Sequence, residues 1–546
     1  MDTNDEKPSA LDASQAVLTN YDLLTTIFQS VNPCHRSWWF RFALVCKAFK
    51  GPALDCLWAQ LDSFVPLLKL LPRLEEFESV IYFHGDIAQS HFREYSVRVR
   101  EINISISKEK STFSGQALTR LAKQLARRSM LPGLRRLRID DLDAFSCSLL
   151  PLIYSSAVDT LEIGAGSLSR TCLPRSLFPS LNTDLPGLRK LAIQNPSLSF
   201  QIEPSILETI LDINTLRSLD LQLPATLFHP EYVVQIGTKL PHLVHLSLDI
   251  GYRHESSTVS HNGTRISNII CPTPPTTEKL FSSLQTLHLT LRDGNTCHVN
   301  ASVRFCAVFT PDFLAHLTSV TLYVSSPLTS LSDFVQCLSR APVFERLELT
   351  QTTQQQSVAV PLAALLPALT LPTIKEVIID VGQLSFANAE EGQNWVQQLV
   401  DVGYSSEASK RTAKVRTLAL PSTSSYPASI QSLKYVALHA IGLERLSLAV
   451  NSSLESLKDG SVLEHLDMIP TSTIRHLDIS DVRANKDFTL MEHSNIAQFI
   501  DRIFPNLEFI QPYRDSRGVG GAHVENWEFI EHLRKEARAL RIFKHL

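Results

Sequence analysis

The sequence predicts an α/β fold in which strand-and-helix units repeat along most of the chain, behind a small all-α unit at the N-terminus. Two observations predict it. From about residue 99 onward the pattern apolar-x-x-apolar-x-apolar recurs, as in Leu134-Arg-Arg-Leu137-Arg-Ile139. Between Val17 and Leu61 that pattern is missing, and apolar residues follow helical spacing instead.

Composition excludes several classes of protein. Of 546 residues, 44% are hydrophobic and 19% charged, so wholesale disorder is excluded. A formal net charge of -4 gives no overall field that would recruit nucleic acid or an anionic membrane. The N-terminus lacks a secretory signal, and the most apolar stretch, residues 358–372, is too short for a membrane span. We therefore expect a cytoplasmic or nuclear protein, or one in both compartments, with no nucleic-acid partner and no membrane partner.

The N-terminal part is expected to be a disordered tail over residues 1–15 and a helical module over residues 16–61. Thr19 or Asn20 could cap the first helix of the helical module. Gly51 is followed by a proline, and we expect this pair to break the later helix.

The repeated pattern predicts one strand and one helix in each unit. Its second and third apolar residues alternate with polar ones, as in a half-buried strand, and helical spacing often follows. The 13 intervals between starts average about 31 residues. One unit cannot bury its apolar face alone, so stacking of units makes the core. The starts are Val99, Leu134, Val158, Leu188, Leu216, Leu243, Leu284, Leu317, Phe344, Ile374, Val415, Leu443, Ile474 and Leu507.

These repeats resemble the leucine-rich repeat family over about three quarters of the chain. The resemblance implies a curved α/β solenoid with a parallel sheet on its concave face and helices on its convex face. We expect it to span residues 62–512, with loop insertions near 251–283, 293–311 and 382–414. The last of these insertions includes a predicted helix. Residues 513–546 are expected to form a connector and a C-terminal capping helix. Its apolar stripe, predicted by helical spacing, is Trp527, Ile530, Leu533, Ala537 and Leu540.

Three segments follow one another in the helical module: LLTTIF from Leu23, LVCKAF from Leu44, and the LWAQL run that ends at Leu61. In this order they resemble the F-box family. The resemblance implies docking onto a Skp-type adaptor, which joins a cullin and a RING subunit in an SCF-type ubiquitin ligase. The chain would be the substrate-recognition subunit. The adaptor-binding residues implied are Leu18, Leu23, Leu24, Ile27, Phe28, Val31, Leu44, Val45, Leu57 and Trp58.

An alternative is that the helical module only caps the solenoid, because solenoids need end caps. The chain would then be a leucine-rich-repeat scaffold or protein-binding module with no role in ubiquitin transfer. Exposure of Leu24, Ile27, Phe28 and Trp58 would favour docking over capping.

Polar side chains between the core positions should line up in rows across the concave face. One row lies two residues after each start and another lies four residues after it. Both rows mix acidic and basic residues, which suits a protein or peptide target of unknown identity. The candidate target-binding residues are Arg136, Arg138, Lys190, His245, His288, Tyr323 and Arg346.

A local basic excess over residues 110–138 raises a phosphopeptide hypothesis for Arg136 and Arg138. The favoured interpretation is that these two arginines pair across strands with Glu101 and Glu162.

No sequence motif indicates catalysis, so we expect no enzyme activity, no catalytic residue and no cofactor. His242, His245 and His288 could approach one another on adjacent strands, and residues 297–306 include two Cys and one His. Neither set has zinc-site spacing, so no metal site is predicted.

Overall fold

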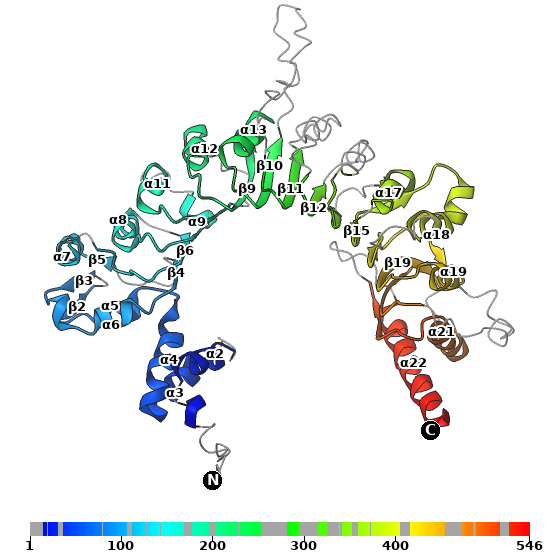
Figure 1. The fold of residues 1–546 in the computed structure, drawn as a ribbon, viewed down its shortest axis with the longest axis horizontal. Helices are drawn as coiled ribbons and strands as arrows, with labels where there is room; N and C mark the ends of the chain where they lie inside the picture. The colour runs from blue at the N-terminus through cyan, green and yellow to red at the C-terminus, as the bar shows by residue number, and fades with distance from the viewer. Residues whose placement is uncertain are drawn as a thin grey trace, which may run out of the picture. The chain divides into compact units, whose positions relative to one another are not determined.

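The computed structural model divides into two compact units, Met1–Ala225 and Thr226–Leu546. Figure 1 colours the chain by residue number from the N-terminus to the C-terminus. It describes all residues except 1–14, 19, 31–35, 79, 106–111, 127, 142–143, 169–176, 196–201, 228–229, 253–280, 294–314, 325–337, 339–340, 352–358, 372, 405–414, 454–471, 484–487, 514–522 and 546. The expected tail, most of the loops near 251–283 and 293–311, and Val31 therefore lie outside the described residues.

Unit 1 begins with the helical module. Its helices are α2 (Tyr21–Ser30), α3 (Arg36–Val45) and α4 (Lys47–Ala59). Both α2 and α3 pack against α4. Asn20 caps α2, because its Oδ1 accepts hydrogen bonds from the backbone N–H groups of Asp22 at 3.0 Å and Leu23 at 3.1 Å.

The predicted helix break at Gly51-Pro52 is wrong. The chain instead turns at Cys46, which has extended backbone angles, and α4 continues through Pro52. A proline in a helix removes one backbone hydrogen bond. Burial of Pro52, Ala53 and Leu54 offsets that loss. Gly51 allows the Tyr21 ring to approach, since a Cβ there would lie 3.0 Å from the ring.

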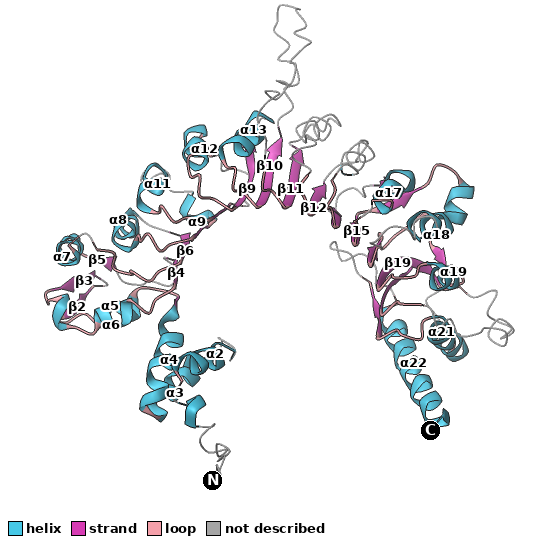
Figure 2. Ribbon diagram, viewed as in Figure 1, coloured by secondary structure: helices cyan, strands magenta, loops and turns pink. Residues whose placement is uncertain are grey.

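The main sheet of unit 1 is parallel, and its strands follow one another in chain order. Helices cover one face of the strands (Figure 2). The strands are β1 (Gln60–Leu61), β4 (Glu101–Ser105), β6 (Arg136–Asp141), β7 (Thr160–Ile163), β8 (Lys190–Gln194) and β9 (Ser218–Leu227).

Smaller elements complete unit 1. An antiparallel pair, β2 and β3, is joined by β5 in a separate three-stranded sheet. The elements are α5 (Val65–Leu68), β2 (Leu74–Phe77), β3 (Val80–Phe83), η1 (Ile87–Gln89), α6 (Phe92–Ser96), β5 (Thr112–Phe113), α7 (Gly115–Leu125), α8 (Ala144–Ile153), α9 (Ala165–Leu168), η3 (Phe178–Ser180), α11 (Leu181–Asp184) and α12 (Pro204–Leu211).

The main sheet of unit 2 is also parallel and follows chain order, with the short β18 added beside β19. The strands are β10 (His245–Tyr252), β11 (Thr286–Asp293), β12 (Ser319–Val324), β13 (Arg346–Gln351), β15 (Glu376–Asp380), β17 (Thr417–Ala419), β18 (Ala428–Ser429), β19 (Arg445–Asn451), β20 (His476–Asp481) and β21 (Phe509–Pro512).

Helices of unit 2 again lie on one face of its strands (Figure 2). Strands β14 and β16 form a separate two-stranded parallel sheet. The elements are α13 (Pro230–Lys239), β14 (Ala359–Pro361), α17 (Leu362–Leu369), β16 (Gln383–Ser385), α18 (Ala389–Tyr404), α19 (Ser432–His439), α21 (Leu490–Ile503) and α22 (Val524–His545). The helix predicted within 382–414 is α18.

The core of both units is built from the repeated apolar pattern. Each of its starts, from Val99 to Leu507, exposes 1% of its surface or less. Strand registers match the rows predicted from sequence: Glu101 pairs with Arg136, and Arg136 with Thr160. The same holds in unit 2, where His245 pairs with Thr286. The fold is thus α/β and solenoid-like, with a mostly parallel sheet.

Candidate functional site

The helical module has a small aromatic core of its own. Phe28 of α2 stacks on Phe42 of α3, with ring centroids 5.1 Å apart, and meets the edge of Phe49 at 5.4 Å. Trp39, Ala53 and Cys56 are buried in the same cluster, and Leu57 packs against it. These contacts fix the three helices relative to one another.

Helix α2 has an inward and an outward face, as a period of 3.6 residues requires. Leu24 and Phe28 point into the module, with 2% and 4% of their surface exposed. Leu23 and Ile27 are on the outside, with 45% and 47% exposed. Of the four implied adaptor contacts in α2, two are therefore exposed and two are core residues that hold them in place.

The end of α3 adds to the exposed apolar surface. Leu44 and Val45 are 70% and 65% exposed, so both are accessible as the resemblance implies. Nine large apolar side chains with substantial exposure lie within residues 17–45, against ten in all the rest of the described chain. We call these nine the apolar surface of the module: Val17, Leu18, Tyr21, Leu23, Ile27, Trp38, Phe40, Leu44 and Val45. Concentrated exposed apolar residues mark an interaction site.

Trp58 has a different role from the exposed residues. It is half-buried, and its ring lies 4.8 Å from that of Tyr95, which belongs to α6 of unit 1. Trp58 therefore joins the helical module to the rest of unit 1. Of the four residues chosen to separate docking from capping, Ile27 is exposed, Trp58 is half-buried, and Leu24 and Phe28 are buried inside the module.

A polar network strengthens this joint. The Tyr21 hydroxyl donates a hydrogen bond to Asp55, and the Arg98 guanidinium pairs with the same carboxylate. Burial and the neighbouring Asp55 raise the pKa of Tyr21 above its ordinary value. Arg36 also bonds across the joint, to Asp62 at 3.1 Å. The apolar surface is thus held in a defined position within unit 1.

The basic candidates on the sheet of unit 1 have acidic partners. Arg136 pairs with Glu101 at 3.4 Å, as predicted. Arg138 pairs along its own strand with Asp140 at 2.7 Å rather than across to Glu162, and that hydrogen bond raises the pKa of Arg138. Glu162 is instead 3.4 Å from Lys190. These contacts favour structural pairing over the phosphopeptide hypothesis for Arg136 and Arg138.

In unit 2, Arg346 is engaged by two carboxylates, Glu376 at 2.8 Å and Glu348 at 2.9 Å. Burial, then the nearby Glu348, raise the pKa of Tyr323. These residues form a polar cluster on neighbouring strands β12, β13 and β15.

His245 and His288 lie on adjacent strands of unit 2 and are both exposed. Burial of the ring, then the nearby His288, lower the pKa of His245. His245 therefore offers a neutral ring at neutral pH. No three His, Cys, Asp or Glu side chains of the described residues gather closely enough to hold a metal ion. Residues 297–306 lie outside that part of the chain.

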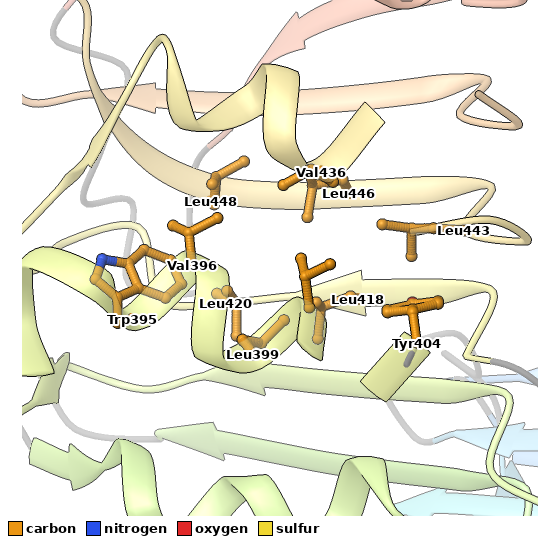
Figure 3. A pocket seen from close by; sticks show the side chains of 11 residues that line it. Trp395, Val396, Leu399, Tyr404, Leu418, Leu420, Val436, Leu443, Leu446 and Leu448 are labelled. Carbon is orange, nitrogen blue, oxygen red and sulfur yellow. The ribbon is translucent and has the colours of Figure 1, made fainter. Parts of the chain in front are cut away.

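Two hollows between helices and strands lie among the described residues of unit 2. One is a gap of about 10 Å³ among leucine and aromatic side chains of α18, α19 and the strands beneath, which is the interior of a repeat (Figure 3). The other is a cleft of about 290 Å³ beside Gly392, Trp395 and Tyr426. Trp395 Nε1 donates to the Tyr426 carbonyl at 2.9 Å, which fixes one wall. Only uncharged residues line this cleft.

Within the described ranges no helix combines the length and apolar character needed to cross a bilayer. Comparison with known proteins finds no matching protein-family model and no matching curated protein. Among solved structures, a chain in the crystal structure of the Rad7 and Elc1 complex in yeast aligns with a TM-score of 0.32 and 12% sequence identity. The alignment covers 75% of this chain and 86% of that chain. A likeness this distant carries no argument about function.

Proposed function

We propose that this protein is the substrate-recognition subunit of an SCF-type ubiquitin ligase. The helical module would bind a Skp-type adaptor, and the repeats would bind a protein target. The observation that carries the proposal is the apolar surface of the module, which coincides with F-box positions Leu18, Leu23, Ile27, Leu44 and Val45. A partner's helices would cover these side chains, much as the two halves of a domain core cover each other.

The joint between module and repeats supports the same role. A recognition subunit performs no chemistry itself, and acts by raising the effective concentration of a target lysine near the transferring enzyme. That task requires a defined distance between adaptor and target. The contacts of Arg98 with Asp55 and of Trp58 with Tyr95 hold the apolar surface of the module in place relative to the first repeats.

One observation favours the alternative function, a repeat scaffold capped by the helical module. β1 follows α4 directly and pairs with β4, so the module does close one end of the sheet. Capping explains burial at Trp58 and Leu61. It offers no reason for the exposure of Ile27, Leu44 and Val45, which a cap would be expected to bury or replace with polar residues.

The test is co-purification of the full chain with a Skp-type adaptor. The variant carries Ile27→Asp and Leu44→Asp, because both residues are exposed and neither substitution disturbs the core. Central interface residues often contribute about 2 kcal/mol each, so we expect capture to fall by more than about tenfold.

The matched control carries Leu438→Asp and Ile441→Asp in unit 2, which are 42% and 46% exposed and change the charge equally. It should bind the adaptor as the unmodified chain does. If the unmodified chain fails to bind, or if Ile27→Asp with Leu44→Asp binds normally, the adaptor proposal is wrong and the scaffold function is favoured.

A further inference from the structure

In the main sheet of unit 1, the residue just before each strand belongs to a continuous backbone ladder. The N–H of Arg135 donates to the carbonyl of Arg100 at 2.8 Å, and that of Asp159 to Arg135 at 2.9 Å. The N–H of Arg189 then donates to Asp159 at 2.8 Å, and that of Arg217 to Arg189 at 2.7 Å. Four arginines and one aspartate therefore lie in register at the starts of five neighbouring strands of the sheet. We call Arg100, Arg135, Arg189 and Arg217 the arginine edge.

Most of these cations have no partner. Arg135, Arg189 and Arg217 are exposed, and in the part of the chain that the structure describes neither an ion pair nor a hydrogen bond engages their side chains. Arg100 donates to the Gly133 carbonyl at 3.1 Å. The one acid in the ladder, Asp159, accepts a hydrogen bond from the Thr160 hydroxyl at 2.8 Å.

Unit 2 uses the same ladder position differently. There, each of three bases stands next to an acid along part of the ladder and pairs with it. Lys375 lies 2.5 Å from Glu345, Arg416 lies 3.9 Å from Glu444, and Arg475 lies 3.6 Å from Glu508. Acidic and basic side chains at this ladder position can therefore neutralise each other. Lys375 and Arg416 are also neighbours, but each is held by an acid. In the described part of unit 1 the neighbours Arg100 and Arg135, and likewise Arg189 and Arg217, form no ion pair, so their like charges repel one another unless an anion binds there.

We propose that the arginine edge binds an acidic segment of a protein partner in extended conformation. Strands lie about 4.8 Å apart, so the Arg100–Arg135 pair and the Arg189–Arg217 pair are centred three strands, about 14 Å, from each other. An extended peptide rises about 3.4 Å per residue, so acidic side chains four residues apart also span about 14 Å. Guanidinium groups bind carboxylates through paired hydrogen bonds.

The neighbouring charges favour spaced carboxylates over a nucleic acid. Asp159 interrupts the edge, Glu101 lies in the row of Arg136, and Glu162 lies in the row of Arg138. A uniformly charged backbone would meet these acids, whereas a peptide can place neutral residues beside them. The inference rests on the proposed function only in taking the bound partner to be the ubiquitylation target.

The probe is a fluorescein-labelled peptide of glycine and serine that carries two Glu-Glu pairs four residues apart, and its anisotropy is followed as the full chain is added. The variant carries Arg135→Gln, Arg189→Gln and Arg217→Gln. We expect it to bind about tenfold more weakly, because three exposed charge contacts are lost. The same peptide with Gln in place of Glu should not bind.

The matched control carries Lys375→Gln, Arg416→Gln and Arg475→Gln, which removes the same charge from the same ladder position in unit 2. It should bind within about twofold of the unmodified chain, because those cations are already paired. Equal loss in both triple variants would show a net-charge effect and overturn the proposal. So would no binding by the unmodified chain, or tighter binding of a single-stranded oligonucleotide of similar length.

Adaptor capture by the triple variant of unit 1 separates this inference from the proposed function. Capture should be unchanged, because the arginine edge contributes nothing to the apolar surface of the module. Normal peptide binding without adaptor capture would remove the ubiquitin role and leave the acidic-segment site in place. Normal adaptor capture without peptide binding would remove the acidic-segment site and leave the proposed ubiquitin role in place.

Discussion

Replacing Arg534 with alanine is expected to destabilise the C-terminal end of unit 2 by about 3–5 kcal/mol. Arg534 of α22 is 1% exposed, yet charged. Its Nε and Nη2 donate to Glu531 at 2.7 and 3.0 Å, and Nη1 donates to the Leu507 carbonyl at 3.2 Å. The alanine would deprive two buried acids, Glu531 at 2.7 Å and Asp501 at 4.0 Å, of this cation.

Hydrogen exchange of α21, β21 and α22 measures the effect, together with chemical denaturation. The control is Lys535→Ala, which removes an ion pair to the same Glu531 at 3.2 Å from a side chain that is 60% exposed. We expect that change to cost less than about 1 kcal/mol. Equal protection of α22 in both variants would show that the buried pair contributes no more than an exposed one.

Replacing Phe28 with alanine is expected to cost about 3–5 kcal/mol and to unfold the helical module. The ring is 4% exposed and contacts Phe42 and Phe49. So small a core has few other contacts to compensate for the loss. Hydrogen exchange over residues 21–59 should become fast, and adaptor capture should be lost with the fold.

Ile27→Ala is the matched control, one residue away and 47% exposed. It should leave exchange over the module unchanged while weakening adaptor capture. Retained protection in Phe28→Ala would mean that the aromatic cluster is not the core of the module.

The strand half of each repeat was predictable from sequence because it follows from local chemistry. Apolar residues at fixed spacing must be buried, and a period of two then fixes which side chains share a row. The same logic predicted Trp527 and Ile530 on the buried side of α22, which are 1% and 0% exposed.

Residues whose environment depends on partners distant in sequence were not predictable in this way. The buried side of α22 includes Glu531 and Arg534, while Leu540 is 65% exposed, because a buried ion pair replaces apolar contact there. Hydrophobic patterns cannot reveal such a pair. In α2, the pattern showed an apolar helix but could not tell that Leu24 and Phe28 are buried while Leu23 and Ile27 are exposed.

Because β1 follows α4 directly, the helical module cannot be removed by truncation without affecting the sheet. β1 begins one residue after α4 ends, and the Arg100 N–H donates to the Ala59 carbonyl at 2.8 Å. A fragment starting at residue 62 would leave β4 as a bare edge strand, with unpaired N–H and C=O groups. Bare edges pair with other chains and aggregate. The two proposed roles of this segment must therefore be separated by point substitutions rather than by truncation.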